Sequence, residues 1–324
     1  MDRAPQLSVV TTMYRSAPYL RAFHERASRV ASALFERVEF VYVNDGSPDE
    51  SLAVALELAR TDPRVRIVDL SRNFGHHHAI VAGLEHASGG LVYLIDCDLE
   101  EEPEMLDALV AAMRADGTAD VAYGIATARK GGFVERVGGA LAYIVINAVA
   151  GTFRLQPNML VARVMSRRYV DAFVAQPESE IVFSGLSANV GFRQLGVPVR
   201  KLSRGTTTYT FARRLIMLVR TLTAFSDRPL IWIAYLGFTI VAASLAYALY
   251  LTVAYFVYRS IPAGYTSLAV SVWFLGGMIL FCMGIIAIYL SVIFIEVKRR
   301  PRYVVREVYE PGAAVGASIP RRPV

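Results

Sequence analysis

The sequence contains little cysteine and little charge. Its 324 residues include only Cys97 and Cys282, and the second lies inside a long apolar run whereas the first does not. Two thiols in such different surroundings do not pair, which excludes a small secreted scaffold held together by disulfides. Only 19% of the residues are charged and 54% are hydrophobic, with a mean hydropathy of +0.39. This composition is too apolar for an ordinary soluble enzyme and predicts that part of the chain lies in lipid.

Charge is missing altogether from two long segments. They cover residues 230–258 and 260–295, with Arg259 alone between them. A membrane span needs about 20 apolar residues, so each segment is long enough to cross. Basic residues flank the outer ends of the pair, in "FARRLIMLVR" before it and "EVKRRPR" after it. The positive-inside rule therefore predicts a transmembrane hairpin with both termini in the cytosol. We expect a multi-pass protein of the cytoplasmic (inner) membrane.

The remaining sequence predicts a cytosolic domain attached to this hairpin. No signal-peptide pattern follows Met1, because "DRAPQ" leads directly into a strand-like run. The net charge of +6 is concentrated beside the apolar segments, which favours a membrane surface, and not nucleic acid, as a partner. Between Phe211 and Phe225 apolar residues recur at a spacing of three and four, which predicts an interfacial helix; a core-facing helix is the alternative. The expected parts are a cytosolic domain (1–208), an interfacial helix (209–228), two spans (229–296) and a basic cytosolic tail (297–324).

Within the expected cytosolic domain, short β-branched runs alternate with helix-length stretches. The runs are apolar on both faces, as in parallel strands that are covered by helices on each side. Alternation of strand and helix predicts an α/β fold with a doubly wound, Rossmann-like sheet. The expected strands are Leu7 to Thr12, Phe40 to Asp45, Val65 to Leu70, Leu91 to Asp96 and Val121 to Gly124.

Six carboxylates crowd the stretch "DCDLEEEPE", residues 96–104. Ligands of such sheets bind beyond the carboxyl ends of the strands, and this stretch begins at one of those ends. If the strand continues to Asp96, the side chains of Asp96 and Asp98 point the same way and Cys97 points into the core. Mg²⁺ and Mn²⁺ prefer oxygen ligands and share their coordination with substrate phosphates. We therefore predict a metal and diphosphate site at Asp96 and Asp98.

The other acids have a simpler explanation. Pro103 suits the first position of a helix, and acidic side chains near a helix N-terminus are stabilised by the helix dipole. Glu101, Glu102 and Glu104 are therefore expected to tolerate substitution. The histidines of "GHHHAI" are expected to begin a helix after Gly75, because three successive histidines cannot all face one metal ion. His76 is expected to lie near the predicted diphosphate site.

Several motifs in their order along the chain resemble one known family. "VVTTMYRSAPYL", "VNDGSPDES", "LSRNFG", "IDCDLEEEPE" and the C-terminal hairpin are similar to those of family 2 glycosyltransferases. Within that family they resemble the polyprenyl-phosphate glycosyltransferases, which are related to dolichyl-phosphate mannose synthase and to bactoprenol glucosyltransferases. The resemblance implies a GT-A fold, a nucleotide-sugar donor, and an undecaprenyl or dolichyl phosphate acceptor.

The resemblance also implies roles for single residues. Asp96 and Asp98 would hold Mg²⁺ or Mn²⁺ against the donor diphosphate, and Glu100 stands where the family commonly has a Gln that touches the metal. Thr11, Tyr14, Asp45 and Arg72 would bind the donor together with Asp96. Ala126 and Thr208 replace basic residues that are common at the lipid phosphate, so the expected acceptor contacts are Arg129, Lys130 and Arg204.

By the same resemblance the reaction is an inverting single displacement. The acceptor phosphate is itself a nucleophile, so positioning and charge stabilisation are expected to dominate. One alternative is a processive polysaccharide synthase, although the Q-x-x-R-W motif is lacking: Trp232 and Trp273, the two tryptophans, lie in the apolar segments. The other is a non-catalytic membrane sensor or scaffold that binds a nucleotide sugar. A homo-oligomer is compatible with the sequence.

Overall fold

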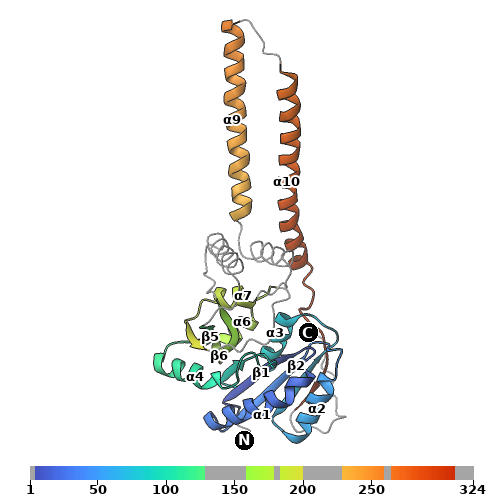
Figure 1. Ribbon diagram of the computed structural model, residues 1–324, viewed down its shortest axis with the longest axis vertical. Coiled ribbons are helices and arrows are strands. Elements are labelled where there is room, and N and C mark those ends of the chain that lie inside the picture. Colours follow the sequence, from blue (N-terminus) through green and yellow to red (C-terminus); the bar gives the residue numbers. More distant parts are fainter. Residues whose placement is uncertain (1–3, 128–157, 179–182, 200–227, 259–263, 311–324) are drawn as a thin grey trace. The chain divides into compact units, whose positions relative to one another are not determined.

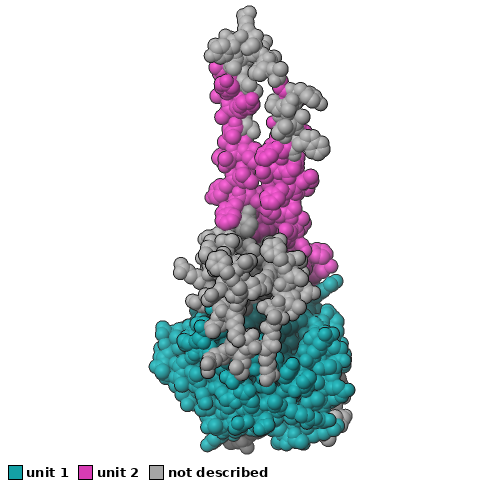
Figure 2. Space-filling view, in the orientation of Figure 1, with its two compact units in different colours: residues 1–143, 153–209, 300–324 teal, residues 144–152, 210–299 magenta. Residues whose placement is uncertain are grey.

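The structure is a computed structural model that describes residues 4–127, 158–178, 183–199, 228–258 and 264–310. The chain divides into two compact units, which Figure 2 distinguishes by colour. The first unit contains residues 1–143, 153–209 and 300–324, and the second contains residues 144–152 and 210–299.

The first unit is built around a mixed sheet with the strand order β7-β5-β6-β4-β1-β2-β3-β8. Figure 1 labels β1, β2, β5 and β6 of this sheet. β4, β1, β2 and β3 are parallel neighbours, whereas β6 is antiparallel to β4 and β5, and β8 is antiparallel to β3. The GT-A, Rossmann-like α/β fold is confirmed. The bounds are β1 Leu7–Met13, β2 Val38–Asn44, β3 Val65–Leu70, β4 Leu91–Leu94, β5 Val121–Ala126, β6 Met159–Ser166, β7 Gln194–Val199 and β8 Val305–Tyr309.

Helices cover both faces of this sheet, which explains why most residues of its central strands are apolar on both faces. Successive side chains of a strand point to opposite faces. Val9 packs with residues of α1, α2 and α4, while its neighbour Val10 packs with residues of α3, α6 and α7. The helices are α1 Ala17–Leu34, α2 Ser51–Thr61, α3 His76–His86, α4 Met105–Asp116, α6 Arg167–Val174 and α7 Phe183–Asn189.

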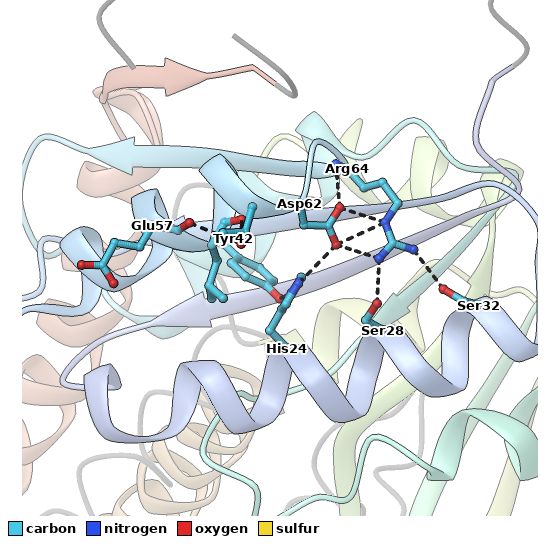
Figure 3. A network of polar contacts seen from close by, with 9 residues as sticks. His24, Ser28, Ser32, Tyr42, Glu57, Asp62 and Arg64 are labelled. Carbon is cyan, nitrogen blue, oxygen red and sulfur yellow. Dashed lines mark hydrogen bonds and ion pairs between the residues drawn. The ribbon is translucent and has the colours of Figure 1, made fainter. Parts of the chain in front are cut away.

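A closed polar network ties α1 to β2 and to the start of β3 (Figure 3). His24 Nδ1 lies 2.7 Å from Tyr42 Oη, and His24 Nε2 lies 3.2 Å from an oxygen of Asp62. Arg64 donates hydrogen bonds to Asp62 and to Ser28 on α1. Burial lowers the pKa of His24, although Asp62 acts in the opposite direction. A neutral ring satisfies both neighbours, because Nδ1 accepts from the Tyr42 hydroxyl and Nε2–H donates to Asp62.

The second unit contains two long helices, α9 Arg228–Tyr258 and α10 Tyr265–Val297. Within α10, the 24 residues Phe274–Val297 are long and apolar enough to cross a membrane, with a hydropathy of 2.8. In α9 the described apolar stretch is shorter, Leu230–Ile240. One expected span thus has support from length and composition, while the second span and the orientation stay predictions.

After α10 the chain returns to the sheet as β8. The backbone N–H of Ser71 donates to Val304, and Val308 pairs with Val68 of β3. This differs from the expectation of a basic tail over residues 297–324. In β8, "VREVY", the charged residues Arg306 and Glu307 are adjacent and Val308 is the one buried residue, so the sequence pattern does not identify this edge strand. The expected interfacial helix, 209–228, lies almost wholly outside the described residues.

Candidate active site

Four loops meet at one edge of the sheet. β4, β1, β2 and β3 are parallel neighbours, so their carboxyl ends lie side by side. In open α/β sheets this edge is where ligands bind. Most of the residues expected to contact the donor and the metal lie in the loops that leave these strands.

Asp45, which follows β2, joins two of these loops. Its side chain is buried, and its two oxygens accept hydrogen bonds from the backbone N–H groups of Phe74 (2.7 Å) and Gly75 (3.0 Å). Burial raises the pKa of Asp45, while these two N–H groups act in the opposite direction. Asp45 therefore fixes the loop between β3 and α3. A contact with the donor would be a second role for the same carboxylate.

Gly46 allows the two loops to approach this closely. Its φ is +57°, and a Cβ atom built there would lie 2.4 Å from the backbone carbon of Arg72. No L side chain fits that gap without moving the backbone. A glycine is therefore required at position 46 for steric reasons, which could not be inferred from the sequence alone.

Tyr14 and Arg72 offer flat surfaces at the same edge. Tyr14 is 46% exposed, and the Arg15 guanidinium carbon lies 5.6 Å from the centre of its ring. The guanidinium carbon of Arg72 lies 3.9 Å from the centre of the Phe74 ring. Arg72 also lines a pocket of about 750 Å³ beside the ends of β2 and β3. Thr11, by contrast, is fully buried within β1, so the structure does not bring it to the open edge.

Asp96 and Asp98 lie in the turn that follows β4. The strand ends at Leu94, so the expected alternation along a strand does not apply at these positions. Both acids are nevertheless half-buried, whereas Cys97 between them is buried and its Sγ donates to the Thr12 carbonyl oxygen at 3.2 Å. The inward placement of Cys97 is confirmed. Burial raises the pKa of Cys97 to about 11, which keeps the thiol protonated.

The turn is held by a local contact. Asp98 Oδ1 accepts a hydrogen bond from the backbone N–H of Glu100 at 2.9 Å. Leu99 between them is buried and has a φ of +61°, a left-handed conformation that costs a non-glycine residue about 1 kcal/mol or more. Such a conformation persists only where the surrounding contacts fix it.

His76 connects the acidic turn to β1. Its Nδ1 lies 3.1 Å from Thr12 Oγ1, and its Nε2 lies 3.6 Å from Asp96 Oδ1. Burial lowers the pKa of His76, while Asp45 and Asp98 act in the opposite direction. α3 begins at His76 as expected, after Gly75 with a φ of +99°. Its place beside Asp96 puts it next to the predicted diphosphate site, and a contact with phosphates stays a prediction.

The acid pair suits a hard divalent ion that is shared with a substrate. Two carboxylates in one turn supply the oxygen ligands that Mg²⁺ and Mn²⁺ prefer, and such ions commonly complete their shell with substrate phosphates and water. Among the described residues, no group of three His, Cys, Asp or Glu side chains is arranged to hold a metal by itself. The pair therefore fits a metal–diphosphate site better than a closed protein cage. The role of Glu100 as a third ligand stays a prediction.

Glu101 differs from the neighbouring glutamates. It is 3% exposed, and its carboxylate accepts the backbone N–H groups of Val161 (3.1 Å) and Ala162 (2.6 Å) in β6. The expectation that Glu101 tolerates substitution is therefore wrong. Three consecutive glutamates give no signal of which one is buried; only the partner on a distant strand does.

Glu102 and Glu104 lie outside the core and pair with Arg26 of α1, at 3.4 and 2.5 Å. α4 begins at Met105, so Pro103 is not the first helical residue, contrary to expectation. The side chains are held by Arg26 instead of by the first turn of α4. Of the expected acceptor contacts, Arg129, Lys130 and Arg204 lie outside the described residues.

Comparison with known proteins identifies the family. The model of Glycosyl transferase family 2 matches residues 8–164. A protein of Mycobacterium tuberculosis described as "Putative glycosyltransferases" is 43% identical over 94% of this chain and 88% of its own length. An uncharacterized glycosyltransferase of Synechocystis is 34% identical, covering 94% of this chain and 96% of its own. The SfII prophage-derived bactoprenol glucosyl transferase of Shigella flexneri is 29% identical, covering 93% of this chain and 98% of its own. The chain is a glycosyltransferase and belongs to glycosyl transferase family 2.

Proposed function

We propose that this glycosyltransferase transfers a sugar from a nucleotide-sugar donor to a polyprenyl phosphate at the cytosolic face of the membrane, with Mg²⁺ or Mn²⁺ at the active site. The observation that carries the proposal is the acid pair Asp96 and Asp98, which is half-buried at the edge where four strands end. The lipid acceptor is supported by the relative named a bactoprenol glucosyl transferase and by the apolar segment Phe274–Val297.

The chain's own residues divide the work between donor and acceptor. Tyr14 and Arg72 would contact the nucleotide, and Asp45 would do so while holding the loop at Gly75. Asp96 and Asp98 would hold the metal ion. The bound ion would act as a Lewis acid that neutralises the charge on the leaving diphosphate.

The displacement needs no strong base. An oxygen of the acceptor phosphate forms a bond to the anomeric carbon, while the bond from that carbon to the donor diphosphate breaks and the diphosphate leaves with the electron pair. Arg129, Lys130 and Arg204 would position the acceptor phosphate. Because the phosphate enters opposite the leaving group, the configuration at the anomeric carbon inverts. Positioning and charge stabilisation then supply most of the rate enhancement.

Product analysis tests the proposal. Purified full-length protein in lipid would be incubated with radiolabelled nucleotide sugars, Mn²⁺ and undecaprenyl phosphate. Label that extracts with the lipid, with mass spectrometry showing one sugar per lipid phosphate, is the expected result. A long polymer would indicate a processive synthase. Binding of a nucleotide sugar without product would indicate a sensor, and either outcome contradicts the proposal.

A further inference from the structure

One buried carboxylate fastens the acidic turn after β4 to a distant strand. The two carboxylate oxygens of Glu101 accept hydrogen bonds from the backbone N–H groups of Val161 and Ala162. An ionised carboxylate is costly to bury unless hydrogen bonds replace its water. Two N–H donors at 3.1 and 2.6 Å provide that replacement. The turn is thus bonded to β6 in addition to its covalent link to β4.

The N–H groups are available because β6 is irregular at this point. Tyr123 of β5 pairs with Arg163 of β6, whereas Ile125 pairs with Met159, so residues 160–162 lie opposite Gly124 alone. Such a bulge interrupts the ladder of strand hydrogen bonds. Buried backbone N–H groups must then find another acceptor, and Glu101 provides it.

Arg163 holds the carbonyl groups of the same bulge. It is 2% exposed, and its guanidinium donates to the carbonyl oxygens of Val161 (3.1 Å) and Leu160 (3.0 Å). Its guanidinium carbon lies 4.4 Å from the centre of the Phe183 ring. The bulge is therefore bonded on its N–H side by a buried anion and on its carbonyl side by a buried cation. This arrangement fixes the place at which Glu101 is anchored.

We propose that Glu101 is a positioning residue for the metal ion, acting through Asp98; this inference rests on the proposed function. Glu101 follows Asp98 by three residues, and the strained Leu99 and the bond from Glu100 N–H to Asp98 lie between them. Anchoring Glu101 to the bulge holds this short segment, and with it the direction of the Asp98 carboxylate. Partners that orient metal ligands in this way typically contribute about 10- to 100-fold to metal affinity.

The test compares glutamates within one turn. Glu101→Gln keeps the shape but turns one acceptor into an NH₂ group that faces a backbone N–H. The matched control is the double variant Glu102→Gln with Glu104→Gln, whose side chains contact Arg26 at the surface. Binding of Mn²⁺ to full-length protein would be measured by electron paramagnetic resonance of the unbound ion, with and without UDP. Thermal unfolding would show that each variant is folded.

The dissociation constant for Mn²⁺ is expected to rise at least about tenfold in Glu101→Gln. In the control it is expected to stay within about twofold, because partly exposed ion pairs contribute little. Should Glu101→Gln fail to fold, Glu101→Asp, which keeps the charge but shortens the reach, is expected to weaken Mn²⁺ binding in the same direction. Equal affinity in the wild type and in whichever Glu101 variant is folded would overturn the positioning role and leave the proposed transfer standing. A wild type that binds no Mn²⁺ would overturn the metal site of the proposed function as well.

Discussion

Two polar clusters on the same sheet differ in how their charges are used. In the network of His24, Tyr42, Asp62 and Arg64, each polar side chain has a partner within the cluster (Figure 3). At the carboxyl ends of the strands, Asp98 is half-buried with one oxygen bonded to the turn's own backbone. A cluster whose polar side chains all pair with one another contributes to the stability of the fold. The half-buried acids in the turn after β4 would suit the divalent cation of the proposed function, which would arrive with its substrate.

The largest expected effect is a loss of transfer activity when an acid in the turn after β4 is replaced. Asp98→Asn should lower transfer to lipid by about a thousandfold or more, because several kcal/mol of metal stabilisation are lost and each 1.4 kcal/mol is tenfold in rate. The midpoint of thermal unfolding should hardly change. Near-normal turnover in purified, lipid-supplied enzyme would contradict the metal role of this turn.

The second prediction concerns the network of His24, Tyr42, Asp62 and Arg64, where a substitution should affect stability and not activity. Asp62→Ala leaves Arg64 and His24 without their shared partner and should lower the free energy of unfolding by about 2 kcal/mol. Transfer per folded molecule should be unchanged. Urea unfolding measures the first quantity and active-site-normalised turnover the second. Arg193→Ala, which breaks the exposed pair with Asp116, is the control and should have little effect on stability. A large fall in turnover per folded molecule in Asp62→Ala would contradict the distinction between the two clusters.

Asp45 lies between these extremes, since it is buried like the network and placed at the open edge. Asp45→Asn keeps one acceptor for the loop at Phe74 and Gly75 but loses the charge. The KM for the nucleotide sugar should rise about tenfold, as expected for a lost charge-assisted hydrogen bond, with kcat changing less. Steady-state kinetics at varied donor concentration separate the two. An unchanged KM would restrict Asp45 to the loop.

The pH dependence of stability should also report on the closed network. Burial lowers the pKa of folded His24, so the unfolded chain binds the proton more readily. The contribution of His24 is therefore complete above about pH 6.5 and is lost as the pH falls below that value toward the lower folded pKa. His76, whose pKa burial also lowers, adds to the same slope. Urea midpoints between pH 8 and 5 should fall less steeply in His24→Gln; an identical slope would show that folding does not lower the pKa of His24.

Much of the fold could be predicted from sequence because both faces of the sheet are covered. The apolar runs that end at Thr12, Asp45, Leu70 and Asp96 are strands within one or two residues of the expected bounds. β6 could not be predicted in the same way. It lies antiparallel between β4 and β5 and contains a bulge with Arg163, so a buried charge interrupts the pattern that identifies a strand.

The site divides in a similar way. The positions of Asp96 and Asp98 at the strand ends could be predicted from their place after an apolar run, and the inward placement of Cys97 from its place between them. Glu101 could not, because its burial depends on backbone N–H groups about sixty residues away along the chain. The lone arginine inside the apolar run "MLVARVM" was the available signal, since a charged residue is rarely buried without a specific set of partners.

One structure would test the central claim most directly: the full-length protein with Mn²⁺ and a nucleoside diphosphate, with the metal located by its anomalous scattering. The account predicts one Mn²⁺ between the diphosphate oxygens and the carboxylates of Asp96 and Asp98, with Glu101 still bonded to Val161 and Ala162. A nucleotide bound at this edge without metal contact to either aspartate would contradict it.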